Sequence, residues 1–496
     1  MEVGLVVYRE HGWVVSRHRA TWTAILAVAL VAMPAVADDL DIGGMVSTDF
    51  RAEVDGPRQG DLTWNINIGE LNLKQRLNPH ISYELDLRVM FDGLAFADNL
   101  HTLDDLTNSL SLDPFWIESD AAYVSFRNVF DGFDIVFGRQ IVTWGASDRF
   151  RPTNNLNSDD LWDPTRFGMT QANEMVRFIY NPIGSLVLEA VYVPIFRPAR
   201  LPSSAAAALA DPDSPIPILE AEIAEELQRQ RGLLGEGFEF VTHTTLNQPD
   251  ISLENSQVGA KVSWQAWESD WSLSYYYGFD DFPHPARSVP DLQRALFGHD
   301  HCDGTPIPTG EPGGCVDTLV RLDYPRIHVA GFDIAGQIPF LDDAGYRIEG
   351  AVIWPDRVEM VTPVLGGELV GTVVDGRPFL RATLGIDYTF TRDIFALVML
   401  VHGMVDELGP QWVGDYAVVG ADFKFFNSKL LLRLFCIAAI DVDHPAGVIY
   451  PMLNWNPWSS MEIEAGALIF LGDNRSKFGQ PAAGESTVFL RSRVRF

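Results

Sequence analysis

Arginine, tryptophan and asparagine gather in residues 138–168, GRQIVTWGASDRFRPTNNLNSDDLWDPTRFG. A guanidinium binds carboxylates through paired hydrogen bonds, and a tryptophan ring offers a flat face for stacking. These residue types suit contact with a small solute better than they suit a plain connection. We therefore predict a solute-contacting loop, whose candidate residues are Trp144, Arg149, Asn154 and Asn155.

Residues for catalysis or metal binding are harder to find. Hydrolysis needs a nucleophile or acid beside a base, and the 11 histidines show no such pairing at strand spacing. The run His299-Asp300-His301-Cys302-Asp303 offers metal ligands. However, Cys302 and Cys315 bracket a Pro/Gly-rich segment, for which a disulfide is the simpler interpretation. We predict no enzyme activity, no catalytic residue, no metal site and no cofactor.

Charged residues alternate with apolar residues in several short segments. In residues 81–91, for example, Glu84, Asp86 and Arg88 share one face, and apolar residues take the other. Such alternation is typical of a strand between two environments. If one face lines a lumen, the phase predicts these pore-lining residues: Glu84, Asp86, Arg88, Arg139, Arg347, Glu349, Arg381, Arg433, Glu462, Glu464, Arg491 and Arg493. Arg326 and His328 follow from the same reasoning. The alternative is that these charges only brace the inner wall.

Arg139 needs an additional assumption, because it shares strand parity with Ile135 and Phe137. A bulge near Gly138 would turn its side chain toward the lumen.

The last residues, STVFLRSRVRF, alternate to the end of the sequence. Val488, Leu490 and Val494 share one face, and three arginines share the other. This segment resembles the final strand of bacterial outer-membrane β-barrels, which ends in phenylalanine and serves as an assembly signal. The resemblance implies that the barrel-assembly machinery recognises Phe496.

Eight short turns, each flanked by alternating segments, organise the rest of the chain. They lie at residues 78–79, 131–132, 181–184, 267–270, 341–345, 391–393, 427–428 and 456–458. With a first and a last strand, the eight hairpins predict an all-β, transmembrane, antiparallel up-and-down barrel of 18 strands, with 16 as the alternative. Five longer segments fall at the opposite end, at roughly 93–117, 145–172, 195–255, 279–323 and 355–376.

The 195–255 segment contains one predicted short helix, at 216–231. Leu219, Ile223 and Leu227 form a stripe, glutamates precede arginines, and Gly232 follows. The helix either plugs the lumen or caps the rim.

Composition narrows the class of protein. The net charge of -31 argues against a nucleic-acid partner, and a mean hydropathy of +0.03 is low for a helical membrane protein. Residues 1–37 have a basic flank, ten apolar residues from Ala24 to Met33, and an A-x-A site, which predict a cleaved secretory signal. Residues 38–496 are then a single barrel domain without a separate plug domain.

A family resemblance adds to this interpretation. Gly138-Arg139-Gln140, Trp144-Gly145 and the run from Tyr192 to Pro202 resemble large bacterial outer-membrane barrels of unknown function, which are similar to alginate-export-type porins. The match covers residues 120–202. It implies that charged lumen residues select the solute, and it favours Arg139 as a pore residue.

We therefore predict a porin-like channel in the bacterial outer membrane, surrounded by outer-membrane lipids, for an unidentified solute. The alternative is a transporter of hydrophobic compounds without a plug domain. A lateral gap in the wall, or an apolar pocket beneath the long loops, would favour that alternative.

Overall fold

The computed structural model describes residues 40–56, 58–94, 107–205, 238–291, 294, 298, 300–302, 304–307, 313–364, 367–441, 443–480 and 483–496. The predicted signal at 1–37 and the predicted helix at 216–231 lie outside the described residues. Within those ranges, no helix has the length and apolar character needed to cross a membrane.

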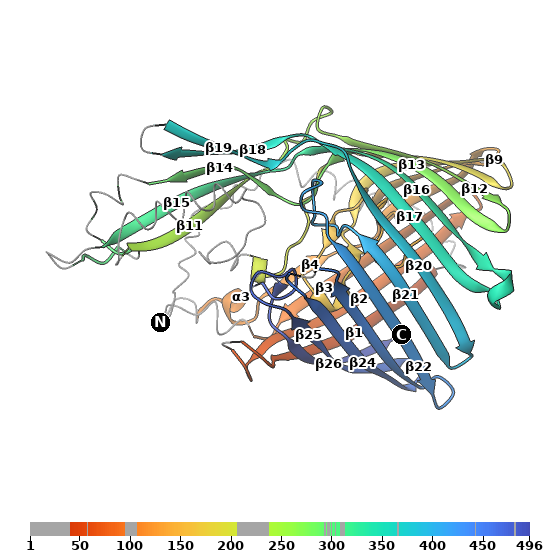
Figure 1. Cartoon of the computed structure of the whole chain (residues 1–496). Coiled ribbons are helices and arrows are strands. Elements are labelled where there is room, and N and C mark those ends of the chain that lie inside the picture. Colours follow the sequence, from red (N-terminus) through yellow and green to blue (C-terminus); the bar gives the residue numbers. More distant parts are fainter. Residues whose placement is uncertain are drawn as a thin grey trace.

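The main sheet is a closed antiparallel barrel (Figure 1). Its first strands are β1 (Leu40–Glu53), β2 (Leu62–Asn78), β3 (Ile81–Asp92), β4 (Phe115–Glu118), β5 (Ala122–Phe130), β6 (Phe133–Gln140), β9 (Asn173–Ile183) and β10 (Leu186–Val193). The next are β12 (Gln257–Ala266), β13 (Ser269–Phe279), β16 (Arg326–Ile338), β17 (Ala344–Pro355), β20 (Phe379–Thr391) and β21 (Ile394–His402). The last are β22 (Asp415–Phe425), β23 (Leu430–Ala439), β24 (Gly447–Trp458), β25 (Met461–Leu471) and β26 (Thr487–Arg495).

The barrel has 18 strands, as the sequence predicts. The sheet contains 19 segments, but β4 and β5 both pair with β3 and form one interrupted wall strand. Strand β26 pairs with β1, from Thr487↔Glu53 to Arg495↔Met45, and this pairing closes the ring. Beyond the ladder, the backbone of Phe496 exchanges two hydrogen bonds with Gly44.

Alternation gives the barrel its two faces. On β1, Val46 and Phe50 are exposed outward, whereas Asp49 and Arg51 are buried inside. The same pattern of exposed large apolar side chains recurs on the outward face around the ring, including Leu87, Leu273, Phe332, Leu384, Val398, Val419, Leu434, Leu453 and Leu490. An outward apolar surface with polar groups inside is the pattern of barrels that sit in lipid.

Short turns join strands at one end, called the turn end here, and long connections lie at the other, the loop end. The Trp267-Glu268 turn has positive φ at both residues, as a two-residue hairpin of the I′ type requires. The last predicted turn, 456–458, is wrong by a few residues. Strand β24 continues to Trp458 across a register shift, and Pro457 lies at that irregularity, where no ladder donor is needed.

A second sheet of five strands projects from the loop end of the barrel (Figure 1). Its order is β11 (Phe238–Asn247), β15 (Gly314–Asp323), β14 (His284–Pro290), β18 (Val358–Val364) and β19 (Gly367–Val374). We predicted only loops over these residues. The pairing joins three segments that are distant in sequence, so no local pattern indicates it.

The remaining elements are short. They are a helix, α3 (Ser109–Leu112), the two-strand pair β7 (Asp159–Asp160) and β8 (Met169–Thr170), and two 3-10 turns, η2 (Pro164–Arg166) and η3 (Pro339–Leu341).

Candidate functional site

The connection from β6 to β9, residues 141–172, folds into the barrel and is called the inward loop. It contacts the wall on several sides. Glu349 on β17 and Thr383 on β20 hold it by hydrogen bonds, while Arg51 on β1 and Arg491 on β26 contact it from another part of the ring. The inward loop therefore spans the interior and restricts it.

Glu349 anchors the first part of the inward loop. Its carboxylate accepts hydrogen bonds from the backbone N–H groups of Ala146, Ser147 and Thr153 at 3.0–3.1 Å, and from Thr153 Oγ1 at 2.7 Å. Gly145 has φ +96°, and a Cβ there would collide with this carboxylate. Glu349 is 0% exposed. It faces inward as predicted, but it lies beneath the loop and does not line an open pore.

Asp163 anchors the far part of the inward loop. Arg51 binds it through two hydrogen bonds of 2.7 Å, and Arg491 lies 3.6 Å away. Burial alone would raise the pKa of the Asp163 carboxyl, but these two guanidiniums hold its pKa at about 2. Asp163 also caps the 3-10 turn that follows, accepting a hydrogen bond from the Thr165 N–H.

A stack of rings reinforces that anchor. The Arg51 guanidinium lies 4.2 Å from the Trp64 ring centroid, and Trp64 contacts Trp162 at 4.4 Å. Arg200 covers Trp162 at 4.1 Å and forms an ion pair with Glu118 at 2.6 Å. Trp162 thus contacts both an aromatic ring of β2 and a guanidinium, and these contacts fix the loop to the wall.

The wall around the barrel closure carries a network of ion pairs. We call it the charged seam: Asp49, Arg51, Glu462, Glu464, Arg491 and Arg493 on β1, β25 and β26. Arg491 pairs with Asp49 at 2.7 Å and with Glu464 at 3.2 Å. Arg493 pairs with Glu462 at 2.7 Å. Each cation of the seam therefore has an acidic partner.

The interior is solvated toward the turn end. Lys74 and Arg495 face inward, yet their side chains are 62% and 56% exposed. Lys74 pairs with Glu84 across β2 and β3, and Arg495 pairs with Glu462. Exposed cations on an inner wall need water, because their burial in an apolar medium is costly. This part of the barrel is a lumen.

The wall next to the charged seam is apolar, on the strands that lead up to β25. Strand pairing sets Leu397 of β21, Gly420 of β22, Phe435 of β23 and Tyr450 of β24 side by side on the inner face, and we call these four residues the apolar row. On the same strands, the inner-face residues one level nearer the loop end pack in a core with Phe150 of the inward loop. Toward the turn end, the ion pair of Asp422 and Arg433 adjoins the row.

A polar pocket lies between the inward loop and the wall. It brings together three of the predicted residues, Asn154, Asn155 and Arg381, with two that we did not predict, Asp159 and Asp281. Burial raises the pKa of Asp281 to about 7, and the Asp280 carboxylate adds to the shift. Burial and Asp281 raise the pKa of Asp159 well above its usual value.

All of the predicted pore-lining residues except Arg139 face inward. Those that keep lumen exposure are Glu84, Arg347, Arg433, Glu462 and Arg493. Those that face inward but are buried by loops or ion pairs are Asp86, Arg88, Glu349, Arg381, Glu464 and Arg491.

Three of our assignments to the lumen are wrong. The pairing of β6 with β9 has no bulge at Gly138, so Arg139 stays on the outward face and pairs with Glu174 at 2.8 Å. Arg326 and His328 also point outward, because Ile327 and Val329 take the inner face of β16. Arg326 covers the Phe279 ring, and His328 contacts the Tyr275 hydroxyl.

Of the loop candidates, Arg149 is exposed inside the barrel, whereas Trp144 is not. Trp144 is 2% exposed, and its Nε1 donates to Glu189 at 2.8 Å. It belongs to the packing between loop and wall and is not available to a solute.

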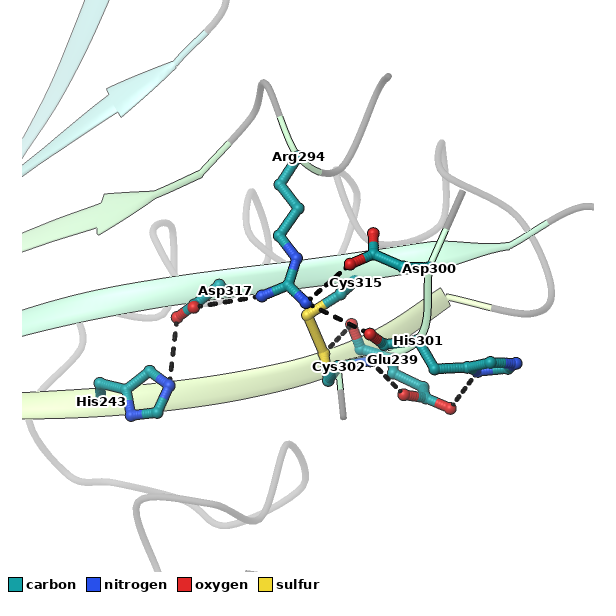
Figure 2. The surroundings of a disulfide bond; sticks show 8 residues. All are labelled: Glu239, His243, Arg294, Asp300, His301, Cys302, Cys315 and Asp317. Atoms are coloured by element: carbon teal, nitrogen blue, oxygen red, sulfur yellow. Dashed lines mark hydrogen bonds and ion pairs between the residues drawn. A yellow bond between two sulfur atoms is a disulfide. The ribbon is translucent and has the colours of Figure 1, made fainter. Parts of the chain in front are cut away.

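The outer sheet carries the predicted disulfide, Cys302–Cys315, near the start of β15 (Figure 2). Beside it, Glu239 accepts from the Cys302 N–H and contacts His301 at 2.7 Å. No cluster of three or more metal-ligating side chains exists in the described ranges. His299 and Asp303 of the considered metal run lie outside them.

Comparison with known proteins gives similarity at the level of solved structures alone. No family model matches the chain, and no curated protein matches it. Pseudomonas aeruginosa OpdK, solved with vanillate, is 8% identical with a TM-score of 0.49, over 92% of this chain and 98% of that chain. Acinetobacter baumannii OccAB3 is 10% identical with a TM-score of 0.48, over 93% and 100%. Salmonella typhi OmpF, solved in complex with daunomycin, is 9% identical with a TM-score of 0.39, over 92% and 97%. Similarity this low carries no conclusion about function, and the strand pairing of this chain alone defines its barrel.

Proposed function

We propose that this chain is a porin-like channel of the bacterial outer membrane. The observation that carries the proposal is the closed 18-strand barrel with an apolar exterior and exposed inward cations, Lys74 and Arg495. A barrel of this strand number is wide enough for an aqueous channel. The inward loop restricts the interior on the loop side, which favours selective passage over free diffusion.

The orientation and targeting complete the proposal. Short turns face the periplasm and long connections face outward in barrels of this kind. Residues 1–37 direct export as a cleaved signal, outer-membrane lipids surround the exterior, and Phe496 is recognised by the barrel-assembly machinery. The resemblance of residues 120–202 to alginate-export-type porins stays a prediction.

The test is conductance in planar lipid bilayers. Purified protein should produce uniform, stable current steps that persist at both polarities. Glu349→Ala should raise the step size, because it frees the first part of the inward loop from the wall. Glu268→Ala, in an exposed turn, is the matched control and should leave the current unchanged. A folded barrel that passes no ions would contradict the proposal.

A transporter of hydrophobic compounds remains a second candidate because of the apolar row. However, every barrel strand pairs with neighbours on both sides, so the described part of the wall has no lateral gap. The apolar row instead faces the lumen, and any apolar group that contacts it arrives through the channel.

A further inference from the structure

The apolar row is unusual for the inner wall of an aqueous channel. Lumen-facing residues of such barrels are polar, and apolar residues face the lipid. Here the inner face of four neighbouring strands carries Leu397, Gly420, Phe435 and Tyr450 at one level. Leu397 and Phe435 both lie within van der Waals range of a Cβ built on Gly420, so their side chains lie along the wall and form one surface.

This surface is not fully used by the packing of the inward loop. Met399, Val418 and Ile437, one level nearer the loop end, are buried in the core with Phe150. Leu397, Phe435 and Tyr450 pack against that core only at its border and stay half-buried. The apolar row therefore lies where the packed half of the barrel gives way to the lumen, and part of it is accessible from that side.

A cation that forms no ion pair within the described residues lies at the same border. Arg149 is next to Phe150, and its Nη1 donates to the Phe167 carbonyl at 2.7 Å. Its side chain is exposed to the interior of the barrel, and no acidic side chain of the described residues lies within ion-pair distance of it. Desolvation inside the barrel and the Arg433 guanidinium lower the pKa of Arg149, whereas Tyr450 and Asp148 act to raise it. The guanidinium thus lies deep in the barrel, close to the apolar row.

The two features together select one kind of solute. We propose that the lumen binds small amphipathic anions, with the apolar body on the row of Leu397, Phe435 and Tyr450 and the anionic group at Arg149. This inference rests on the proposed channel function and names its solute class. A charge-assisted hydrogen bond to a guanidinium is strong because the donor is ionised. Contact with the row adds the release of water from apolar surface.

A purely structural role for these residues makes a different prediction. If the apolar row served only to hold the inward loop, a solute would gain nothing from a ring or an alkyl chain. If Arg149 only capped the Phe167 carbonyl, an anionic group would gain nothing either. Three probes separate these cases: benzoate has both the ring and the carboxylate, acetate has only the carboxylate, and benzylammonium has the ring with the opposite charge.

Calorimetric titration of the purified full-length protein in detergent tests binding without requiring conductance. We expect benzoate to bind at least about tenfold more tightly than acetate or benzylammonium. Arg149→Gln should weaken benzoate binding about tenfold, and Arg149→Lys should retain most of it because the charge remains. Phe435→Ser should weaken benzoate binding while leaving acetate unchanged. Arg287→Gln removes one exposed charge from the outer sheet and is the matched control.

Equal binding of the three probes, or no benzoate binding, would overturn this inference even if the protein conducts ions. Unchanged benzoate binding in a folded Arg149→Gln variant would overturn the placement of the anionic group. Benzoate binding by a barrel that passes no current would support the site and contradict the channel, so the two proposals fail separately.

Discussion

Two adjoining parts of the barrel wall hold the same loop by different means. At the charged seam, Arg51 and Arg491 bind Asp163 through buried ion pairs. On the adjoining strands, Phe150 packs among apolar side chains of β21 to β25. The seam cancels its own charge, because each of its cations has an acidic partner. At the apolar wall, Arg149 forms no ion pair with any acidic side chain of the described residues.

This difference separates two requirements that a selective channel must meet. Ion pairs fix the position of the inward loop without adding net charge to the lumen. The adjoining apolar wall also stabilises the loop, and it presents a surface to a solute beside Arg149, a cation that forms no ion pair within the described residues. The asymmetry also distinguishes Arg149 from the apolar row beside it, and these two features orient a solute with a polar and an apolar end.

The largest loss of unfolding free energy is expected when the anchor of the inward loop at the charged seam is removed. Asp163→Ala leaves Arg51 and Arg491 buried without their shared partner, and breaking a buried pair on one side costs about 3–5 kcal/mol. The free energy of unfolding in lipid vesicles, measured by urea titration, should fall by that amount. Asp148→Ala, on the same loop but exposed, is the control and should change little. A loss below about 1 kcal/mol for Asp163→Ala would mean that ion pairs do not hold the loop.

A smaller loss of unfolding free energy is expected when a buried side chain of the apolar wall is shortened. Met399 is buried on the inner face and covers Gly385 of the neighbouring strand. Met399→Ala removes this contact and should cost about 2 kcal/mol, at the low end for a buried methionine because water in the lumen relieves the cavity. Val398→Ala, on the outward face of the same strand, is the matched control. Equal losses for the two variants would contradict an apolar core inside the barrel.

The barrel could be predicted from the sequence because its signal is local. Alternation within ten residues gives a strand two faces, and short turn residues count the hairpins. The same alternation assigned inner or outer faces correctly wherever the strand was unambiguous, as at Glu462 and Arg493. It failed at Arg326, where the segment is too apolar on both faces for phase to decide, and at Arg139, where we assumed a bulge that is absent.

The functional interior could not be predicted in the same way. An inward residue either contacts the aqueous lumen or is covered by the inward loop, depending on where residues 141–172 fold. Strand alternation carries no information about the position of that segment. Glu349 and Arg347 share one face of β17, yet Arg347 is half-buried whereas Glu349 is fully buried. The apolar row could not be predicted for a related reason. The sequence of a continuous apolar strand such as Ile394–Val401 does not show which of its residues face inward. One local signal for an anchor was present: Asp163 followed by Pro164 is a typical start of a helical turn.

A pH effect is expected at the polar pocket. Because burial raises the pKa of Asp281 to about 7, this carboxyl gains negative charge between pH 6 and pH 8. The preference of the channel for anions, measured as the reversal potential in a salt gradient, should therefore fall as pH rises through about 7. Asp281→Asn removes the titrating group and should flatten this dependence, with Asp291→Asn in the outer sheet connection as control. A wild-type profile without a change in this range would place the pocket outside the path of ions.

The smallest change in unfolding free energy is expected at the solvent-exposed edge of the charged seam. Arg495 pairs with Glu462 at 2.9 Å, but its side chain is 56% exposed. Exposed pairs contribute less than about 1 kcal/mol because water and salt screen them, so Arg495→Gln should leave the unfolding free energy almost unchanged. Arg491→Gln, on the same strand and face, removes a buried partner of Asp49 and Glu464 and should be far more costly. The two variants remove the same charge from the same strand, so burial alone distinguishes them. A similar loss in both would mean that seam charges act through the overall field of the barrel. The contrast between the paired charges of the seam and Arg149, which forms no ion pair within the described residues, would then no longer hold.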